Sequence, residues 1–146
     1  MRHILAVSDF YVDLLEQARQ HSATVEMFVS EPACWWPNGM GGFMKPDAYT
    51  VLALSGVRDH WWIEIDLATE SLPTLQRKLS AYLDFVARGQ LGPGGVVPQV
   101  LVTASTPARC AGLRTLALRL PAPAPEFVVV LPQAEAAAAL VQSLHE

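Results

Sequence analysis

Between residues 59 and 105 a strand, a helix and a second strand follow one another, and this order restricts the folds open to the chain. The segment DHWWIEIDLA (59–68) has the pattern of a half-buried strand. Ser71 can cap a helix over residues 72–88, whose leucines recur at helical spacing. The segment QVLVTAS (99–105) is apolar throughout, which is typical of a strand buried on both faces. Because a helical crossover joins parallel strands, the sequence predicts an α/β sheet in which these two strands are parallel.

The remaining segments extend this sheet. The strand DAYTVLAL (47–54) is expected to form a hairpin with 59–68, turning near Gly56. Ser8 or Asp9 can cap the first helix. The predicted order is α-β-β-β-α-β-α-β-α, a mixed α/β sheet with helices on both faces. The other predicted ranges are helix 4–21, strand 23–30, loop 31–45, helix 107–118, stiff connector 121–125, strand 126–132 and helix 133–146.

Composition and charge limit the class of protein. Of the 146 residues, 51% are hydrophobic and 16% are charged, as in a compact globular chain, and we expect a single domain over residues 1–146. We expect no signal peptide, no membrane-spanning segment and a cytoplasmic location. Cys34 and Cys110 lack metal-ligand spacing and agree with reduced thiols. A net charge of −4 argues against a stand-alone nucleic-acid binder that relies on charge, but not against a nuclease whose acids hold a metal.

Three acids are predicted to meet at one edge of the hairpin. Glu64 and Asp66 share one face of their strand because side chains alternate across it. Asp47 opens the partner strand, so antiparallel pairing brings it beside residues 64–66. Carboxylates that lie so close together raise each other's pKa values or bind a hard cation such as Mg²⁺ or Mn²⁺. The alternative interpretation is a set of solvated acids at a strand end, with Glu70 favoured by the start of the next helix.

The same region carries a family resemblance. The string KPDAYTVL…GVRDHWWIEIDLATESLPTLQRKLSAYLDFV resembles the replication-relaxation family of plasmid and actinobacterial proteins, and the resemblance extends over residues 1–132. That family in turn resembles the PD-(D/E)XK nucleases, whose restriction-endonuclease-like fold has an αβββαβ core with a mixed central sheet flanked by helices. The residues that carry the family motif are Pro46-Asp47, Glu64-Ile65-Asp66, Thr69-Glu70, Lys78 and Tyr82.

The resemblance implies a site and a function. Asp47 and Glu64 would be the metal-binding acids, and the Ile65 backbone carbonyl would be a third ligand. The cofactor would be Mg²⁺ or Mn²⁺, and the chain would be a nuclease-like domain of a plasmid replication or mobile-element protein that hydrolyses phosphodiesters in DNA. The competing class is a non-catalytic interaction module that keeps the nuclease scaffold.

One position departs from the nuclease pattern. The superfamily lysine belongs two residues after the second acid, where this chain has Asp66. An aspartate cannot stabilise the developing negative charge, although it could be a third metal ligand or a base for the attacking water. Lys78 shares a helix face with Tyr82 and is the expected stand-in, or else a solvated lysine. Lys45 is the weaker candidate.

The resemblance also predicts the partners of this chain. Family members often carry an N-terminal winged-helix domain, which we do not expect in this chain. DNA is therefore the expected partner, with help from another domain or protein, and a homo-oligomer is compatible with the sequence.

Other features leave two interpretations open. The loop around Trp35 and Trp36 is either a mobile flap or a loop held against the core by its tryptophans. Glu31 and Glu16 are candidates for outer-shell acids. The histidines show no ligand spacing, and Arg109, Arg114 and Arg119 recur every five residues, so they form no basic stripe.

Overall fold

The computed structural model describes residues 2–146, and the side chains from His3 onward. A five-stranded sheet with the order β1-β4-β5-β6-β7 forms its centre. β4 is antiparallel to β1 and β5, whereas β6 is parallel to β5 and β7. The mixed α/β sheet expected from the sequence is therefore confirmed. The strand bounds are Thr24–Ser30 (β1), Ala48–Leu54 (β4), Val57–Asp66 (β5), Gln99–Ala104 (β6) and Val128–Pro132 (β7).

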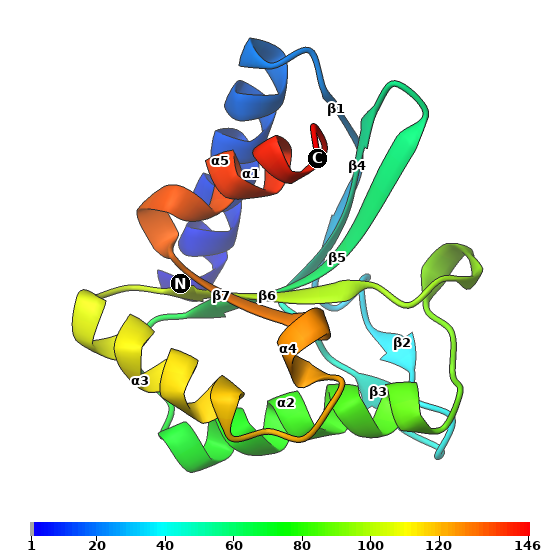
Figure 1. The fold of residues 1–146 in the computed structure, drawn as a ribbon, viewed down its shortest axis with the longest axis vertical. Coiled ribbons are helices and arrows are strands. Elements are labelled where there is room, and N and C mark those ends of the chain that lie inside the picture. Colours follow the sequence, from blue (N-terminus) through cyan, green and yellow to red (C-terminus); the bar gives the residue numbers. More distant parts are fainter. Residues whose placement is uncertain (1) are drawn as a thin grey trace.

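Helices cover both faces of the sheet (Figure 1). α1 and α5 lie together on one face, and α2 and α3 lie on the other. After β5 the chain passes through α2 and then forms β6, which is parallel to β5. This is the parallel crossover that the sequence predicted. The helix bounds are Arg2–Gln20 (α1), Leu72–Ala87 (α2), Pro107–Leu118 (α3), Ala124–Phe127 (α4) and Gln133–Ser143 (α5).

The hairpin of β4 and β5 aligns the two strands that carry the predicted acids. Its turn is Ser55–Gly56, and both residues have positive φ values of 50° and 83°. Two such residues match the right-handed twist of a two-residue hairpin, and glycine adopts this conformation without steric cost. The register pairs Ala48 with Ile63, so the residue before β4 lies beside Glu64.

The sheet separates two hydrophobic cores. Leu14 of α1 packs with one set of strand side chains, including Ile63 and Ile65. Leu79 of α2 and Leu113 of α3 pack with the other set, which includes Trp62. The alternation along β5 thus directs successive side chains to opposite cores, and Glu64 points to the α2 side with Trp62.

Several expected boundaries differ from the structure. Ser8 and Asp9 lie inside α1 and do not cap it, because the helix begins six residues before Ser8 at Arg2. The expected loop 31–45 contains a small antiparallel ribbon of β2 (Trp36–Pro37) and β3 (Phe43–Met44). The connector 121–125 runs into α4, where Phe127 is buried. These short elements have no periodic pattern, so the sequence did not predict them.

No helix between residues 2 and 146 is long and apolar enough to cross a lipid bilayer.

Candidate functional site

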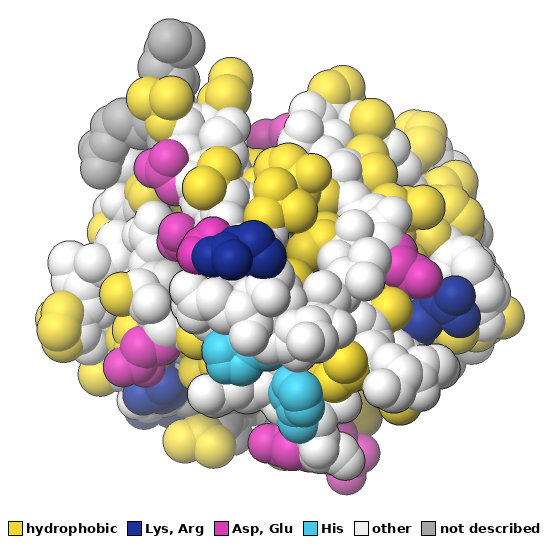
Figure 2. Space-filling model, turned by 90° about the horizontal axis from the view of Figure 1, so that it is seen from above, with side chains coloured by type: hydrophobic (Ala, Val, Ile, Leu, Met, Phe, Trp, Pro, Cys, Tyr) yellow, Lys and Arg dark blue, Asp and Glu magenta, His cyan; other side chains and the backbone are white. Residues whose placement is uncertain are grey.

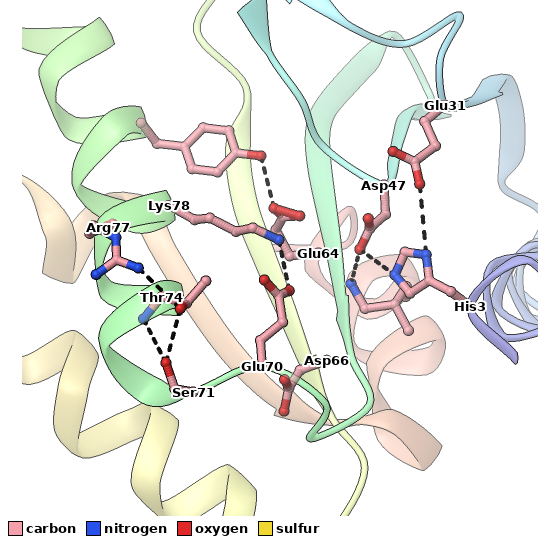
Figure 3. Close-up of polar contacts among 12 residues, drawn as sticks. His3, Glu31, Asp47, Glu64, Asp66, Glu70, Ser71, Thr74, Arg77 and Lys78 are labelled. Atoms are coloured by element: carbon pink, nitrogen blue, oxygen red, sulfur yellow. Dashed lines mark hydrogen bonds and ion pairs between the residues drawn. The ribbon is translucent and has the colours of Figure 1, made fainter.

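An open cleft of about 730 Å³ lies where β4 begins and β5 ends. Asp47, Glu31 and His3 line one side of it, and Glu70 and Lys78 line the other (Figure 3). Leu67 and Thr69, which follow β5, also line the cleft. The hairpin, the first helix and α2 therefore bring residues far apart in the sequence into one cleft.

Two hydrogen bonds fix the position of Asp47, the residue before β4. Its backbone N–H donates to the Ile63 carbonyl at 2.9 Å, and its Oδ2 accepts from the Ile65 N–H at 2.7 Å. Burial raises the pKa of Asp47, and the nearby charge of Glu31 adds to this, against the opposing effects of the Ile65 N–H and His3. The Ile65 peptide thus orients Asp47 through its N–H, and the role of the Ile65 carbonyl as a metal ligand stays a prediction.

Glu64 lies on the same face, beneath the cleft. Its side chain is buried, and Oε2 accepts from the Tyr82 hydroxyl at 3.3 Å. Burial raises the pKa of Glu64 well above its ordinary value, and the charge of Asp47 raises it further. The register of the hairpin makes the two acids cross-strand neighbours, as the sequence predicted. Two buried carboxylates that disfavour each other's charge create a site that favours a cation.

Lys78 projects from α2 into the same cleft as Asp47. Its Nζ donates to Glu70 Oε1 at 2.8 Å. Burial lowers the pKa of Lys78, but the Glu70 hydrogen bond and the charges of Glu64, Glu70 and Asp47 outweigh that effect and raise it. The lysine is therefore a charged group beside both acids. Glu70, which the sequence placed at a helix start, is its direct partner.

The Asp66 side chain binds Arg109 and does not join Asp47 and Glu64, contrary to the prediction from the sequence. Its two oxygens accept from Arg109 of α3, at 2.7 Å from Nε and 3.1 Å from Nη2. Arg109 also donates to the Glu70 carbonyl oxygen, which ties the end of β5 to the entry of α2. The expected convergence of three carboxylates is thus reduced to Asp47 and Glu64, because Arg109 engages both oxygens of the third. The spacing of the arginines gave no sign of this partner, which lies 43 residues away.

His3 is a second residue that the sequence did not single out. Its Nε2 lies 3.0 Å from Asp47 Oδ2, and its Nδ1 lies 3.7 Å from Glu31 Oε1. Ligand atoms of all three residues lie within 4.8 Å of one another. The folding of α1 onto the β4 end of the sheet creates this cluster, so no spacing along the chain could have revealed it.

The tryptophan loop packs against the protein. The Trp36 Nε1–H donates to the Leu91 carbonyl at 2.9 Å, and Trp35 and Trp36 both pack against the α2-side core. Lys45 places its ammonium 4.8 Å from the centroid of the Trp35 ring. These contacts favour the interpretation of a loop held by its tryptophans. They also place the Lys45 ammonium against an aromatic face at the cleft, while Lys78 faces the acids.

A larger hollow of about 940 Å³ lies between α1, α3 and α5 at the ends of β6 and β7. Its charged lining side chains are all exposed and comprise Asp9, Asp13, Arg114 and Glu135. Exposed charges of mixed sign need no ligand to balance them, whereas the buried acids of the smaller cleft do. We therefore assign the candidate site to the cleft around Asp47.

The fold and the cleft define a mixed α/β protein with two buried acids and a lysine at the edge of its sheet. The chain belongs to the replication-relaxation family, whose model matches residues 1–100, and this membership associates it with plasmid replication or relaxation. The cleft residues from His3 to Lys78 all lie within the matched part, whereas Arg109 lies beyond it. No curated protein and no solved structure gives a significant match.

Proposed function

We propose that the cleft hydrolyses phosphodiester bonds in DNA with the help of a divalent metal ion. The observation that carries this proposal is the pair of buried acids, Asp47 and Glu64, beside the ammonium of Lys78. Phosphoryl chemistry needs ligands for a hard cation and a positive charge for the developing oxyanion. The three side chains supply both kinds of group from two strands and one helix.

The donor set fits Mg²⁺ or Mn²⁺. Asp47 and Glu64 offer carboxylate oxygens, which these ions prefer, and the Ile65 carbonyl is the expected third ligand. Burial raises the pKa of both acids, and the charge of Asp47 adds to the shift at Glu64, so a bound cation would remove an electrostatic cost. Such an ion lowers the pKa of a bound water and polarises a phosphoryl oxygen. The protein's part is to hold the two carboxylates, which the Ile65 N–H and the Tyr82 hydroxyl orient.

Lys78 has the charge and the place for an electrostatic stabiliser. Its side chain is 41% exposed, so a phosphate in the cleft could reach it. Glu70 holds the ammonium at 2.8 Å and keeps it over the cleft. In this proposal Lys78 stands in for the lysine that the nuclease pattern expects at Asp66. Asp66 itself anchors Arg109 and takes no part in the chemistry.

The order of the elements supports a relation to the PD-(D/E)XK nucleases. Leaving out the small ribbon of β2 and β3, the chain runs α1, β1, β4, β5, α2, β6. This is the αβββαβ order of the restriction-endonuclease-like core, with one antiparallel hairpin followed by a parallel crossover. Asp47 directly precedes β4 and Glu64 lies within β5, which agrees with the roles that the resemblance implies for the two acids.

DNA is the proposed substrate, and another domain or protein is proposed to help to bind it. The chain has a net charge of −4, whereas a DNA surface needs clustered positive charge. On the face shown in Figure 2, the basic side chains are few and lie among acidic and apolar ones. Arg58 is also paired with an acid, Glu26, at 2.6 Å. The cleft would then cut DNA that a partner delivers.

A second candidate function is a non-catalytic module that keeps the nuclease scaffold. The observation that favours it is Asp66, which occupies the lysine position and is bound on both oxygens by Arg109. In that case Lys78 and Glu70 would form only a half-exposed ion pair, which contributes little to stability.

Cleavage of supercoiled plasmid separates the two functions. We expect the full chain to nick or linearise plasmid with Mg²⁺ or Mn²⁺ and to lose this activity in EDTA. Asp47→Asn should abolish cleavage, and Lys78→Met should lower the rate by about 10²–10³, the scale for removing one electrostatic stabiliser. Arg77→Met is the matched control, because it removes a neighbouring charge on α2 that contacts Thr74 at 3.2 Å, away from the acids.

The nuclease function would be rejected if the wild-type chain cleaved plasmid no faster than Asp47→Asn with either ion. Circular dichroism would have to show that both proteins are folded. Loss of activity in Arg77→Met equal to that in Lys78→Met would reject the specific role of Lys78. Lys45 would then be the only other lysine in the chain to test.

A further inference from the structure

His3, Glu31 and Asp47 form a cluster on the solvent side of the cleft that the proposed nuclease chemistry does not use as a unit. α1 supplies His3, Glu31 directly follows β1, and Asp47 directly precedes β4. The three side chains point toward one another, with the imidazole between the two carboxylates (Figure 3). They differ in kind from the Asp47–Glu64 pair because one donor is a nitrogen.

The distances suit a single metal ion. Around a tetrahedral Zn²⁺ ion, bonds of 2.0–2.2 Å place any two ligand atoms about 3.3–3.6 Å apart. Asp47 Oδ2 lies 3.0 Å from His3 Nε2, and Glu31 Oε1 lies 3.7 Å from the other ring nitrogen, Nδ1. An ion binds only one of these nitrogens, and one ligand atom from each of the three residues lies within 4.8 Å of the other two. A small movement of the half-exposed Glu31 side chain would bring all three donors onto one ion.

Each carboxylate of the cluster is oriented from behind by a protein donor. Asp47 Oδ2 accepts from the Ile65 N–H at 2.7 Å. Glu31 Oε2 accepts from Trp35 Nε1 at 3.4 Å, which leaves Oε1 toward the imidazole. Metal-binding carboxylates usually have such outer hydrogen bonds, which fix the ligand orientation. The tryptophan loop thus gains a role in holding one ligand of the cluster.

The charges around the cluster also favour a cation. Lys45 lies against the Trp35 ring and Lys78 pairs with Glu70, so neither of the two lysines forms an ion pair with Glu31 or Asp47. Within residues 3–146, the ion pairs of Glu31 and Asp47 are those with His3, so a single imidazole is the direct partner of two carboxylates. A divalent ion would balance them while using the imidazole as a ligand.

We propose that His3, Glu31 and Asp47 bind a divalent transition-metal ion, with Zn²⁺ preferred over Mg²⁺. Imidazole is a good ligand for Zn²⁺, whereas Mg²⁺ takes oxygen ligands almost alone. Three protein ligands leave positions for water or a phosphate oxygen. This site shares Asp47 with the proposed nuclease site, but its binding does not rest on nuclease activity.

Zinc binding by the full chain, free of any polyhistidine tag and without DNA, tests the proposal. We expect one Zn²⁺ per chain in competition with a chromophoric chelator, and no displacement by a hundredfold excess of Mg²⁺. His3→Gln and Glu31→Gln should each weaken binding at least tenfold with an unchanged Tm of the metal-free chain. The ring nitrogens of His3 should shift on zinc addition in a histidine-selective NMR spectrum.

Two matched variants make the assignment specific. The His21 and His145 rings lie 6.3 Å apart and offer another pair of histidines, so His145→Gln tests whether zinc binds there. Glu64→Gln should stop DNA cleavage but keep zinc binding within about threefold, because Glu64 belongs only to the nuclease site. Failure of the nuclease proposal would therefore leave the zinc result unaffected.

Three outcomes would overturn the zinc site. They are no binding at one equivalent, full binding by His3→Gln, and loss of binding in His145→Gln while His3→Gln binds normally. The first two would make the cluster an ion-pair network only, and the third would move the zinc to the two distant histidines.

Discussion

At the residue scale, the cleft is defined by acids that the protein buries at an electrostatic cost. Asp47 and Glu64 are 8% and 5% exposed, and each has only a few hydrogen bonds to offset the loss of water. Burying a charged group with few compensating contacts is among the more costly events in folding. A chain that keeps two such groups side by side has a local reason to bind a cation or a proton.

This cost predicts how stability depends on pH in the absence of metal. Burial, and then the charge of Asp47, raise the pKa of Glu64 well above its ordinary value of 4.5. A carboxyl with a raised folded-state pKa contributes stability below the unfolded pKa and loses it as the pH rises through the folded pKa. The wild-type Tm in EDTA should therefore fall across this window, from about pH 4.5 upward.

Glu64→Gln should remove this loss. The amide keeps the shape and carries no charge, so the variant should have the higher Tm at the alkaline end, by about 2–4 °C for each kcal/mol of lost repulsion. The two proteins should converge in Tm near the acidic end. Thermal scans by circular dichroism across the pH range measure this, with the exposed Glu126→Gln as the control. A constant difference at every pH would contradict the burial of a titrating Glu64.

At the scale of elements, one ion pair joins three pieces of secondary structure. Asp66 ends β5, Arg109 lies in the first turn of α3, and the Glu70 carbonyl precedes α2. The Thr106 hydroxyl caps α3 by accepting from the Arg109 N–H at 3.1 Å, which places the arginine at the strand end. The pair is well buried, with Asp66 3% and Arg109 15% exposed in their side chains. It thus fixes the two helices that cover the α2 side of the sheet.

Breaking this pair from one side should be costly. Arg109→Met leaves the buried Asp66 charge without its partner and should lower the free energy of unfolding by about 3 kcal/mol. The double variant Asp66→Asn/Arg109→Met should recover much of the loss, because no charge is then left unpaired. Urea unfolding measures both, with the exposed Arg119→Met as the control on the same side of the molecule. An unchanged stability in Arg109→Met would leave Asp66 free for a role in the cleft.

At the scale of the whole molecule, one sheet holds two cores together. Leu14 of α1 lies in one core, and Leu113 of α3 lies in the other, and both are fully buried. The strands contribute alternate side chains to both cores, so neither can lose its packing without exposing the other face of the same strands. The candidate site lies at the edge of this shared sheet and depends on both layers, with His3 from one and Lys78 from the other.

The shared sheet predicts a single unfolding transition. Leu14→Ala and Leu113→Ala should each lower the free energy of unfolding by about 2–5 kcal/mol, the usual cost of such a cavity. Each should shift one transition that far-ultraviolet circular dichroism and tryptophan fluorescence report at the same denaturant concentration. Leu118→Ala is the control on α3, because that side chain is 81% exposed and should change stability by less than about 0.5 kcal/mol. Two separate transitions would contradict the coupling of the cores.

The sequence by itself determined the elements that have a strong periodic pattern. Alternation predicted the hairpin of β4 and β5, and the apolar run predicted β6 beside β5. Helical spacing predicted α2, and Ser71 caps it by accepting from the Thr74 N–H. The same register argument placed Asp47 beside Glu64, because pairing in a hairpin is a local geometric consequence of the turn.

Only the tertiary structure decided which partner each side chain of the site takes. Asp66 pairs with Arg109, and Lys78 pairs with Glu70. Asp47 pairs with His3, a residue 44 positions earlier in the chain. Periodicity predicts the face of a helix or strand on which a side chain lies. It does not predict which other element will pack against that face. The partners follow from how α1 and α3 dock on the sheet, and docking depends on the sum of many apolar contacts distributed along the whole chain. The local pattern therefore predicted the acids, and the packed layers determined the cleft around them.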